Sequence, residues 1–169
     1  MTQRMPVVRQ MQWMGLIPQF VAIAVLAVIA YVVFPALDIP IDIFIAALGY
    51  LIFCRVMRAR FVRDHRMGMR AYNAQKFQDA ISHFEASYRF FSTHPRLDSW
   101  RSLLFGVASP NSYRVVALCN MAYCYSQSGY GQQAIKLYEQ ALLEKPDCAI
   151  AKASLNMLNS VSPTTNAEK

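Results

Sequence analysis

An uninterrupted apolar run from Trp13 to Phe34 limits what this chain can fold into more than any other feature. The run contains no charged side chain, and Gln19 is its only polar residue. At 1.5 Å per residue, about 20 helical residues cross the roughly 30 Å of a bilayer's hydrocarbon core. The run is also longer than the about 7 to 15 apolar residues of a cleaved signal peptide. We therefore expect a retained transmembrane helix over about residues 13–34.

A second apolar segment follows a break at Pro35 to Pro40, and we expect a second transmembrane helix over about residues 40–57. Its uncharged core, Ile43 to Cys54, is short for a full crossing. Arginine can lay its apolar stem along the lipid while its charge stays at the interface, which lengthens the usable span. A second crossing is therefore favoured, with a re-entrant or interfacial helix as the alternative.

Basic residues flank the two apolar segments, whereas the loop between them is acidic. Arg4 and Arg9 precede the first segment, and the loop carries Asp38 and Asp42. Because positive charge stays on the cytoplasmic side, this pattern predicts a multi-pass protein of the bacterial inner membrane with both termini cytoplasmic. The net charge of +7 is concentrated after the second segment, which favours a lipid-surface role over nucleic-acid binding. The arginines expected at the membrane surface are Arg55, Arg58, Arg60, Arg63 and Arg66.

The cysteines of the chain lack the spacing of a disulfide-stapled secreted domain. Cys119 and Cys124 lie within one apolar helical pattern, and Cys54 and Cys148 lie far from them in the sequence. We therefore expect buried free thiols, which agree with a reducing compartment.

The segment from Val115 to Cys148 has the pattern of two amphipathic helices joined by a tight turn. Apolar residues recur at helical spacing on both sides of Gly129, which suits a left-handed helix cap. Pro146 ends the second helix because the residue before a proline avoids helical geometry. The two apolar stripes are Leu118, Met121, Ala122 and Tyr125, and Ala134, Leu137, Tyr138, Ala141 and Leu142.

This pattern resembles the tetratricopeptide repeat, a family whose unit of about 34 residues forms two antiparallel helices. The resemblance implies a stack of helix pairs that binds a partner protein on one face. It is carried by Leu118, Met121, Ala122, Tyr125, Ala134, Tyr138, Ala141 and Pro146.

A less regular copy of the repeat lies upstream. Ala80 corresponds to Ala134, but the two lie further apart than one repeat, so about twenty residues are inserted between the copies. Apolar residues after Pro146 predict a capping helix, because the end of a repeat stack needs its open face covered. The upstream copy matches the family at Gly68, Phe77, Ala80 and Phe84 and departs from it at Ala71, Ser87 and Ser92.

The sequence therefore predicts an all-α fold, in which an N-terminal transmembrane helical hairpin precedes a tetratricopeptide-like domain of two repeats and a capping helix. The expected ranges are 1–57 for the membrane anchor, 58–160 for the repeat domain and 161–169 for a disordered tail. Within the domain, we expect repeat 1 at about 61–92, the insert at 93–112, repeat 2 at 115–148 and the cap at 149–160.

The resemblance implies that partner-binding residues come from the first helix of each repeat. In the insert, Trp100 and Phe105 either pack on the repeats or face a partner or the membrane interface, since Trp is a common hot-spot residue. The candidates on the repeats, for which a plain solvent-facing role is the alternative, are Arg70, Asn73, Asn120 and Tyr123.

No pattern in the chain indicates catalysis. His65, His83 and His94 have no nucleophile with a recognisable motif beside them. Cys119 and Cys124 lie on different faces of one helical pattern, and the second close pair of a usual zinc site is missing. We therefore expect a protein that is not an enzyme and has no catalytic residue, metal or cofactor.

These features are compatible with three functions. The leading hypothesis is a membrane-anchored scaffold that mediates protein–protein interaction or complex assembly at the cytoplasmic face, with an unidentified protein partner, membrane lipids and no nucleic acid. The first alternative is a structural accessory subunit of a larger membrane complex, bound through its transmembrane hairpin, where Gly49 contributes a small-residue face. The second is a basic juxtamembrane module that binds the lipid surface.

Overall fold

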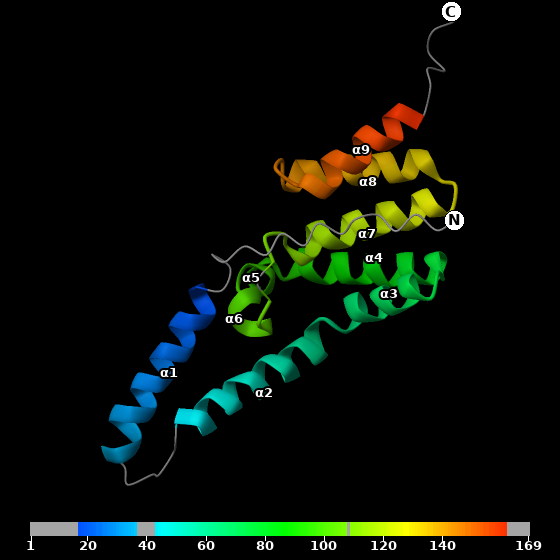
Figure 1. Ribbon diagram of the computed structural model, residues 1–169. Coiled ribbons are helices and arrows are strands. Elements are labelled where there is room, and N and C mark those ends of the chain that lie inside the picture. Colours follow the sequence, from blue (N-terminus) through cyan, green and yellow to red (C-terminus); the bar gives the residue numbers. More distant parts are fainter. Residues whose placement is uncertain (1–16, 37–42, 108, 162–169) are drawn as a thin grey trace, which may run out of the picture. The chain divides into compact units, whose positions relative to one another are not determined.

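The computed structural model describes residues 17–36, 43–107 and 109–161. Throughout these residues the regular structure is helical and no strand occurs, so the predicted all-α class is confirmed. The predicted tail beyond Val161 and the residues Arg4, Arg9, Asp38 and Asp42 lie outside the described residues. The helices are α1 (Ile17–Ala36), α2 (Ile43–Phe61), α3 (Arg63–Asn73), α4 (Phe77–Thr93), α5 (Pro95–Ser99), α6 (Arg101–Phe105), α7 (Tyr113–Gln127), α8 (Gly131–Glu144) and α9 (Ala149–Val161) (Figure 1).

The chain divides into two compact units, which are described separately. Unit 1 consists of Met1–Arg58 and Trp100–Pro110, and unit 2 consists of Ala59–Ser99 and Asn111–Lys169. The segment expected as an insert at 93–112 is therefore divided between them. Residues 93–99 and 111–112 belong to unit 2, and Trp100–Pro110 belongs to unit 1 with the apolar helices.

In unit 1, the short helix α6 packs on both apolar helices. It packs directly against α1. The Tyr50 hydroxyl of α2 donates a hydrogen bond of 2.9 Å to the backbone carbonyl of Leu103, and Cys54 Sγ lies 3.4 Å from the same oxygen. Phe105, the last residue of α6, is only 2% exposed. Part of the insert thus supplies contacts that the sequence pattern did not assign to it.

The structure does not support the predicted membrane crossings. Across residues 17–36, 43–107 and 109–161, no helix combines the length and the hydropathy that crossing a membrane requires. In α2 the physical reason is plain, because its uncharged part ends at Cys54, about 18 Å from its start at the 1.5 Å rise per residue, and Arg55 follows. The predicted localisation, a multi-pass integral membrane protein with both termini cytoplasmic, is contradicted. The predicted transmembrane hairpin is not confirmed, and the accessory-subunit alternative stays a prediction.

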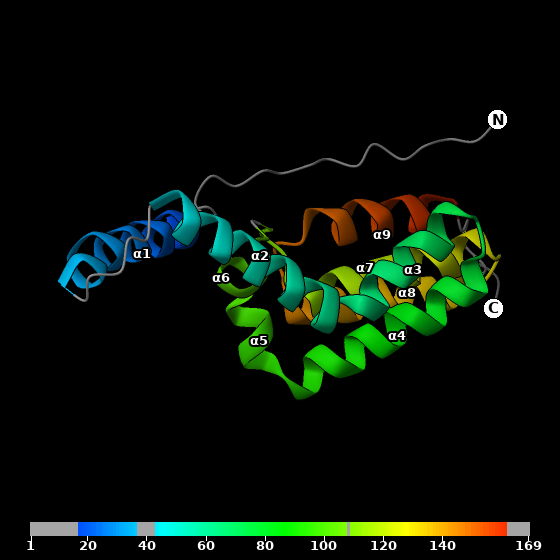
Figure 2. The ribbon, with the colours of Figure 1, turned by 90° about the horizontal axis from the view of Figure 1, so that it is seen from below.

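Unit 2 contains a series of helices in which each packs against its neighbour. α4 packs on both α3 and α7, and α8 packs on both α7 and α9. These helices remain adjacent when the view is turned by 90° (Figure 2). The amphipathic patterns explain the series, since each of these helices has an apolar stripe that is stable only when another helix covers it.

The α3–α4 and α7–α8 turns share one geometry. Gln75 and Gly129 occupy equivalent positions, and both have a positive φ, 59° and 83° respectively. The amides of Lys76 and Tyr130, each 2.9 Å from a carbonyl oxygen of the preceding helix, close the two turns. A residue in the left-handed conformation stops a helix and lets the chain reverse. The two helix pairs are therefore joined in the same way.

Buried residues also occupy equivalent positions in the two helix pairs. α3 and α4 approach each other closely, because a Cβ atom on Gly68 would lie 2.8 Å from the ring of Phe84. Ala80 and Ala134 are both fully buried on the second helix of their pair. Small residues at these positions let the helices approach each other closely. The equivalent buried pairs are Gly68 and Ala122, Ala80 and Ala134, Phe84 and Tyr138, and Ser87 and Ala141.

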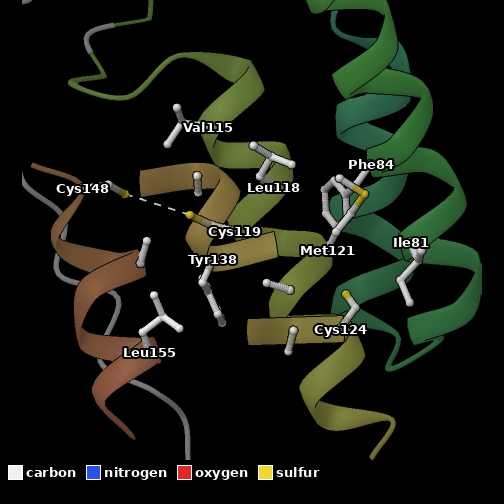
Figure 3. Close-up of a cluster of buried hydrophobic side chains, with 14 of the residues drawn as sticks. Ile81, Phe84, Val115, Leu118, Cys119, Met121, Cys124, Tyr138, Cys148 and Leu155 are labelled. Carbon is white, nitrogen blue, oxygen red and sulfur yellow. Dashed lines mark hydrogen bonds between the residues drawn. The ribbon is translucent and has the colours of Figure 1, made fainter. Parts of the chain in front are cut away.

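Buried side chains from α4, α7, α8 and α9 form one continuous core. In Figure 3, Ile81 and Phe84 of α4 lie on one side of α7, and Cys148 and Leu155 lie on the other. Tyr138 of α8 is among the largest fully buried side chains of this core. The apolar contacts therefore continue from the first helix pair through to α9.

A buried carboxylate begins α7. Asp98 at the end of α5 is 3% exposed, and its two oxygens accept hydrogen bonds from the amides of Tyr113 (2.8 Å) and Arg114 (3.2 Å). Ser112 caps the next free amide, that of Val115, at 3.2 Å. These amides have no partner within the helix, and a negative charge is favourable at a helix N-terminus. The insert thus fixes the start of the second helix pair.

Candidate partner-binding face

α3 and α7, the first helices of the two pairs, lie side by side in unit 2. Their contacting side chains follow each other in the same order along both helices, so the helices run in the same direction. On α3 these residues recur at i, i+4 and i+7, which places them on one stripe. The contacts are His65 with Tyr113 (ring centroids 5.1 Å apart), Met69 Sδ with Asn120 Nδ2 (3.5 Å) and Tyr72 with Tyr123 (ring centroids 5.3 Å).

Two of the four repeat-domain candidates lie at this junction. Asn120 and Tyr123 are partly exposed on α7 and contact α3, and we call them, with Met69 and Tyr72, the α3–α7 seam. Arg70 and Asn73 are exposed on α3. Asn73 lies four residues after Met69, so it is a surface neighbour of the seam.

A row of arginines borders the seam on α3. Arg63, Arg66 and Arg70 stand at i, i+3 and i+7, so they share one face of the helix, and all three are exposed. Among the described residues, the ion pairs involve Arg89 and Arg114, and no acidic side chain pairs with these three. We call them the arginine stripe. Its positive charge is therefore open to solvent.

Tyr72 of the seam is held in its neutral form. Burial and, to a smaller extent, the neighbouring Tyr123 raise the pKa of Tyr72 to about 12. Tyr72 also packs edge-on against Phe77 of α4, with ring centroids 6.4 Å apart. At neutral pH the Tyr72 hydroxyl therefore keeps its proton and remains a hydrogen-bond donor.

Sequence reasoning missed Met69 and Tyr72, which complete the seam. The resemblance pointed to the first helix of each repeat, and the residues off the apolar stripe were chosen there. Met69 and Tyr72 are apolar or aromatic residues, so they were not among the candidates chosen there. Their spacing from His65 places all three on one stripe, and that spacing was the available indication of a second contact surface on α3.

A polar network joins α4, α7 and α8 at another place in unit 2. Glu144 accepts hydrogen bonds from the Tyr88 hydroxyl (3.0 Å) and from Arg114 Nη2 (2.8 Å), and Gln140 Nε2 donates to the Tyr88 oxygen at 2.9 Å. The hydrogen bond with Glu144 raises the pKa of Arg114, against the opposing effect of burial. These bonds connect α4, α7 and α8, so we assign the network to holding the two helix pairs together.

The two aromatic candidates of the insert differ in exposure. Trp100 is 59% exposed, whereas the Phe105 ring is enclosed in unit 1. A partner can therefore reach the Trp100 side chain, while Phe105 contributes to packing.

The arginines predicted at the membrane surface are all exposed, and they belong to different units. Arg55 and Arg58 lie on α2 in unit 1, and Arg60 lies near the end of α2 in unit 2. Arg63 and Arg66 are the first members of the arginine stripe on α3. The basic run of the sequence is thus divided between two parts of the fold.

Potential catalytic and metal-binding groups are enclosed or dispersed. Within the described residues, no group of three or more His, Cys, Asp or Glu side chains could hold a metal ion. His65 Nδ1 lies 3.4 Å from Ser87 Oγ, and both residues are buried, with the rings of Phe84 and Tyr113 against the imidazole. This pair is therefore part of the core.

Comparisons with known proteins do not indicate what the α3–α7 seam binds. No protein-family model, no curated protein and no solved structure matches the chain. The equivalent turns, the equivalent buried positions and the exposed α3–α7 face are accordingly the observations on which a function is proposed.

Proposed function

We propose that unit 2 is a tetratricopeptide-like module that acts as a scaffold and binds a segment of a partner protein on α3 and α7. In this proposal, α3–α4 and α7–α8 are the two repeats and α9 is the cap. The turns at Gln75 and Gly129 support the repeat assignment, because the same bond pattern closes both helix pairs. The buried positions shared by the two pairs support it independently of the turns.

The observation that carries the proposal is the arginine stripe beside the seam. Arg66 and Arg70 are like charges at i, i+4, an arrangement that weakens a helix by about 0.2–0.5 kcal/mol. Within the described part of the chain, the fold gains no ion pair from them in return. A partner with carboxylate groups would supply the missing countercharges, and guanidinium–carboxylate hydrogen bonds are among the stronger polar contacts. We therefore assign an acidic protein segment as the occupant.

The seam favours a protein segment over a simple polyanion. Asn73 and Asn120 present side-chain amides, which can both donate to and accept from a peptide backbone. Tyr72 and Tyr123 add partly exposed aromatic surface, a residue type enriched at binding hot spots. A peptide has backbone amides for the two asparagines, apolar side chains for the two tyrosines and carboxylates for the arginine stripe.

The test is selection of peptides from a displayed library of random sequences, with the full chain as bait. Selected peptides are expected to be enriched in Asp and Glu. A bait with Arg66→Glu and Arg70→Glu should lose that enrichment, and a selected peptide should bind this variant at least about tenfold more weakly by fluorescence anisotropy. The matched control is Lys136→Glu, an exposed charge reversal on α8 that should leave binding unchanged.

Two results would contradict the proposal. One is a peptide selection that does not change when the arginine stripe is reversed. The other is salt-sensitive sedimentation of the chain with phosphatidylserine vesicles while no acidic peptide is selected, since that outcome would assign the stripe to lipid headgroups.

A further inference from the structure

Two buried thiols meet where α9 begins. Cys119 of α7 and Cys148, the residue before α9, have sulfur atoms 4.0 Å apart, as the dashed line in Figure 3 shows. Their exposed fractions are 6% and 1%. All four cysteines of the chain are free thiols, and this is the pair whose sulfur atoms are in contact. The separation is close to van der Waals contact, so a small movement joins the two atoms.

The surroundings give the two thiols different roles. The hydrogen bond from Cys119 lowers the pKa of Cys148, and the amides of Ala151 and Ile150 in the first turn of α9 lower it further, against the effect of burial. The same hydrogen bond and burial raise the pKa of Cys119. Cys148 is therefore the member that ionises, and a thiolate is the reactive form of cysteine.

We propose that Cys119 and Cys148 are a redox-active pair that forms an intramolecular disulfide and thereby fastens α9 to α7. This inference rests on the sulfur geometry and does not depend on the proposed binding function. α9 packs on α8 at the end of the helix series, and such terminal elements open locally at a lower free-energy cost than the core. Opening of α9 would admit a small oxidant to Cys148.

The chemistry requires an oxidant, and we assign a peroxide. The Cys148 thiolate attacks one oxygen of hydrogen peroxide, the O–O bond breaks, and Cys148 becomes a sulfenic acid with release of hydroxide. The Cys119 sulfur then attacks the Cys148 sulfur, the S–O bond breaks, and the Cys119 proton leaves with the hydroxyl group as water. Two thiol sulfurs are oxidised by two electrons in total, and one peroxide is reduced.

Cys124 provides a matched comparison within the same core. It is as deeply buried on α7 as Cys119, and burial raises its pKa to about 11. It has no sulfur contact of the kind that joins Cys119 to Cys148. We therefore expect Cys124 to stay reduced under conditions that join the other two.

The test is oxidation of the full chain with hydrogen peroxide, followed by intact-mass measurement and peptide mapping without reduction. We expect a loss of two hydrogens per chain and a bond between the peptides that contain Cys119 and Cys148. The mapping uses a Cys124→Ser background, because no Lys or Arg separates Cys119 from Cys124 for tryptic cleavage. Oxidation should raise the Tm of this background by about 5–10 °C, since the bond closes a loop of about 30 residues.

Single variants separate the two roles. In Cys119→Ser the sulfenic acid of Cys148 cannot be resolved, so a dimedone adduct should accumulate on Cys148. The variant is reduced and folded at the start, as circular dichroism checks. The adduct is measured after hydrogen peroxide is added. A disulfide that includes Cys54, a disulfide between Cys124 and Cys148 in the Cys119→Ser variant, an adduct on another cysteine, or an oxidised chain with unchanged Tm would overturn the proposal.

Discussion

At the scale of single residues, Gly68 is the position where the packing of unit 2 leaves least room. Replacing it with alanine puts a Cβ atom 2.8 Å from the ring of Phe84, which is fully buried. We predict that Gly68→Ala lowers the free energy of unfolding by about 1–3 kcal/mol, the usual cost of overpacking. Chemical denaturation of the full chain measures the change.

The control for Gly68 is Gly131→Ala at the start of α8. A Cβ atom there meets nothing within 4 Å, and its backbone is helical. Because alanine favours a helix over glycine, this variant should be neutral or more stable by up to about 1 kcal/mol. Equal losses in the two variants would show that backbone freedom, rather than the Phe84 contact, sets the requirement for glycine.

Gln75 holds a backbone conformation that its side chain disfavours. Its φ of 59° is left-handed, and its counterpart in the second helix pair is Gly129. The left-handed conformation costs a residue with a Cβ atom roughly 1 kcal/mol, a penalty that glycine escapes. We predict that Gln75→Gly raises the free energy of unfolding by up to about 1 kcal/mol, measured by urea denaturation.

The comparison variant is Gln133→Gly, an exposed residue inside α8. There the same substitution should destabilise by about 0.5–1 kcal/mol, because glycine is a poor helix former. The changes in the free energy of unfolding should therefore have opposite signs in Gln75→Gly and Gln133→Gly. A loss of stability at both positions would refute the strain at Gln75.

At the scale of secondary-structure elements, Asp98 links the insert to the second helix pair. Its carboxylate accepts from the first two amides of α7 and is almost fully buried. We predict that Asp98→Ala lowers the free energy of unfolding by about 1–3 kcal/mol, because it removes a cap and leaves buried amides without an acceptor. Asp98→Asn keeps an acceptor oxygen and should lose less. Thermal and urea denaturation provide the measurement.

Asp79, exposed in the first turn of α4, is the control for Asp98. It interacts with the helix dipole from the surface, so Asp79→Ala should cost at most about 1 kcal/mol. If Asp98→Ala costs no more than Asp79→Ala, the buried cap is not what holds the start of α7.

The helices were more predictable from the sequence than the contacts between them. The stripe through Ala134 and Tyr138 is local, because helical spacing alone places its residues on one face, and the all-α class followed from such patterns. The Asp98 cap joins residues on either side of a loop, and no periodicity records that pairing. The same holds for the contact of Tyr72 with Tyr123, since it depends on how two separate helix pairs pack.

The apolar helices show a second limit of prediction from the sequence. Hydrophobicity indicates that a segment is withdrawn from water, but it does not say what covers that segment. From the sequence, residues 40–57 were expected to cross a membrane. In the structure α2 continues through Arg55 and Arg58 to Phe61, and Tyr50 bonds to the insert at Leu103.

At the scale of the whole molecule, the chain consists of two units with different surfaces. Unit 1 contains the apolar helices and the α6 segment, and unit 2 contains the helix pairs with the arginine stripe. The charge of the basic run is divided between them, so its members need not act together. We propose binding for unit 2, because the stripe on α3 lies beside the seam between α3 and α7.

The most direct test of this assignment is amide chemical-shift mapping on the full chain with one selected acidic peptide. We expect the largest shifts on α3 and α7, at Met69, Tyr72, Asn120 and Tyr123 and along the arginine stripe. Shifts concentrated on the exposed surface of α8, around Lys136 and Glu139, would contradict it and place the partner elsewhere on the molecule.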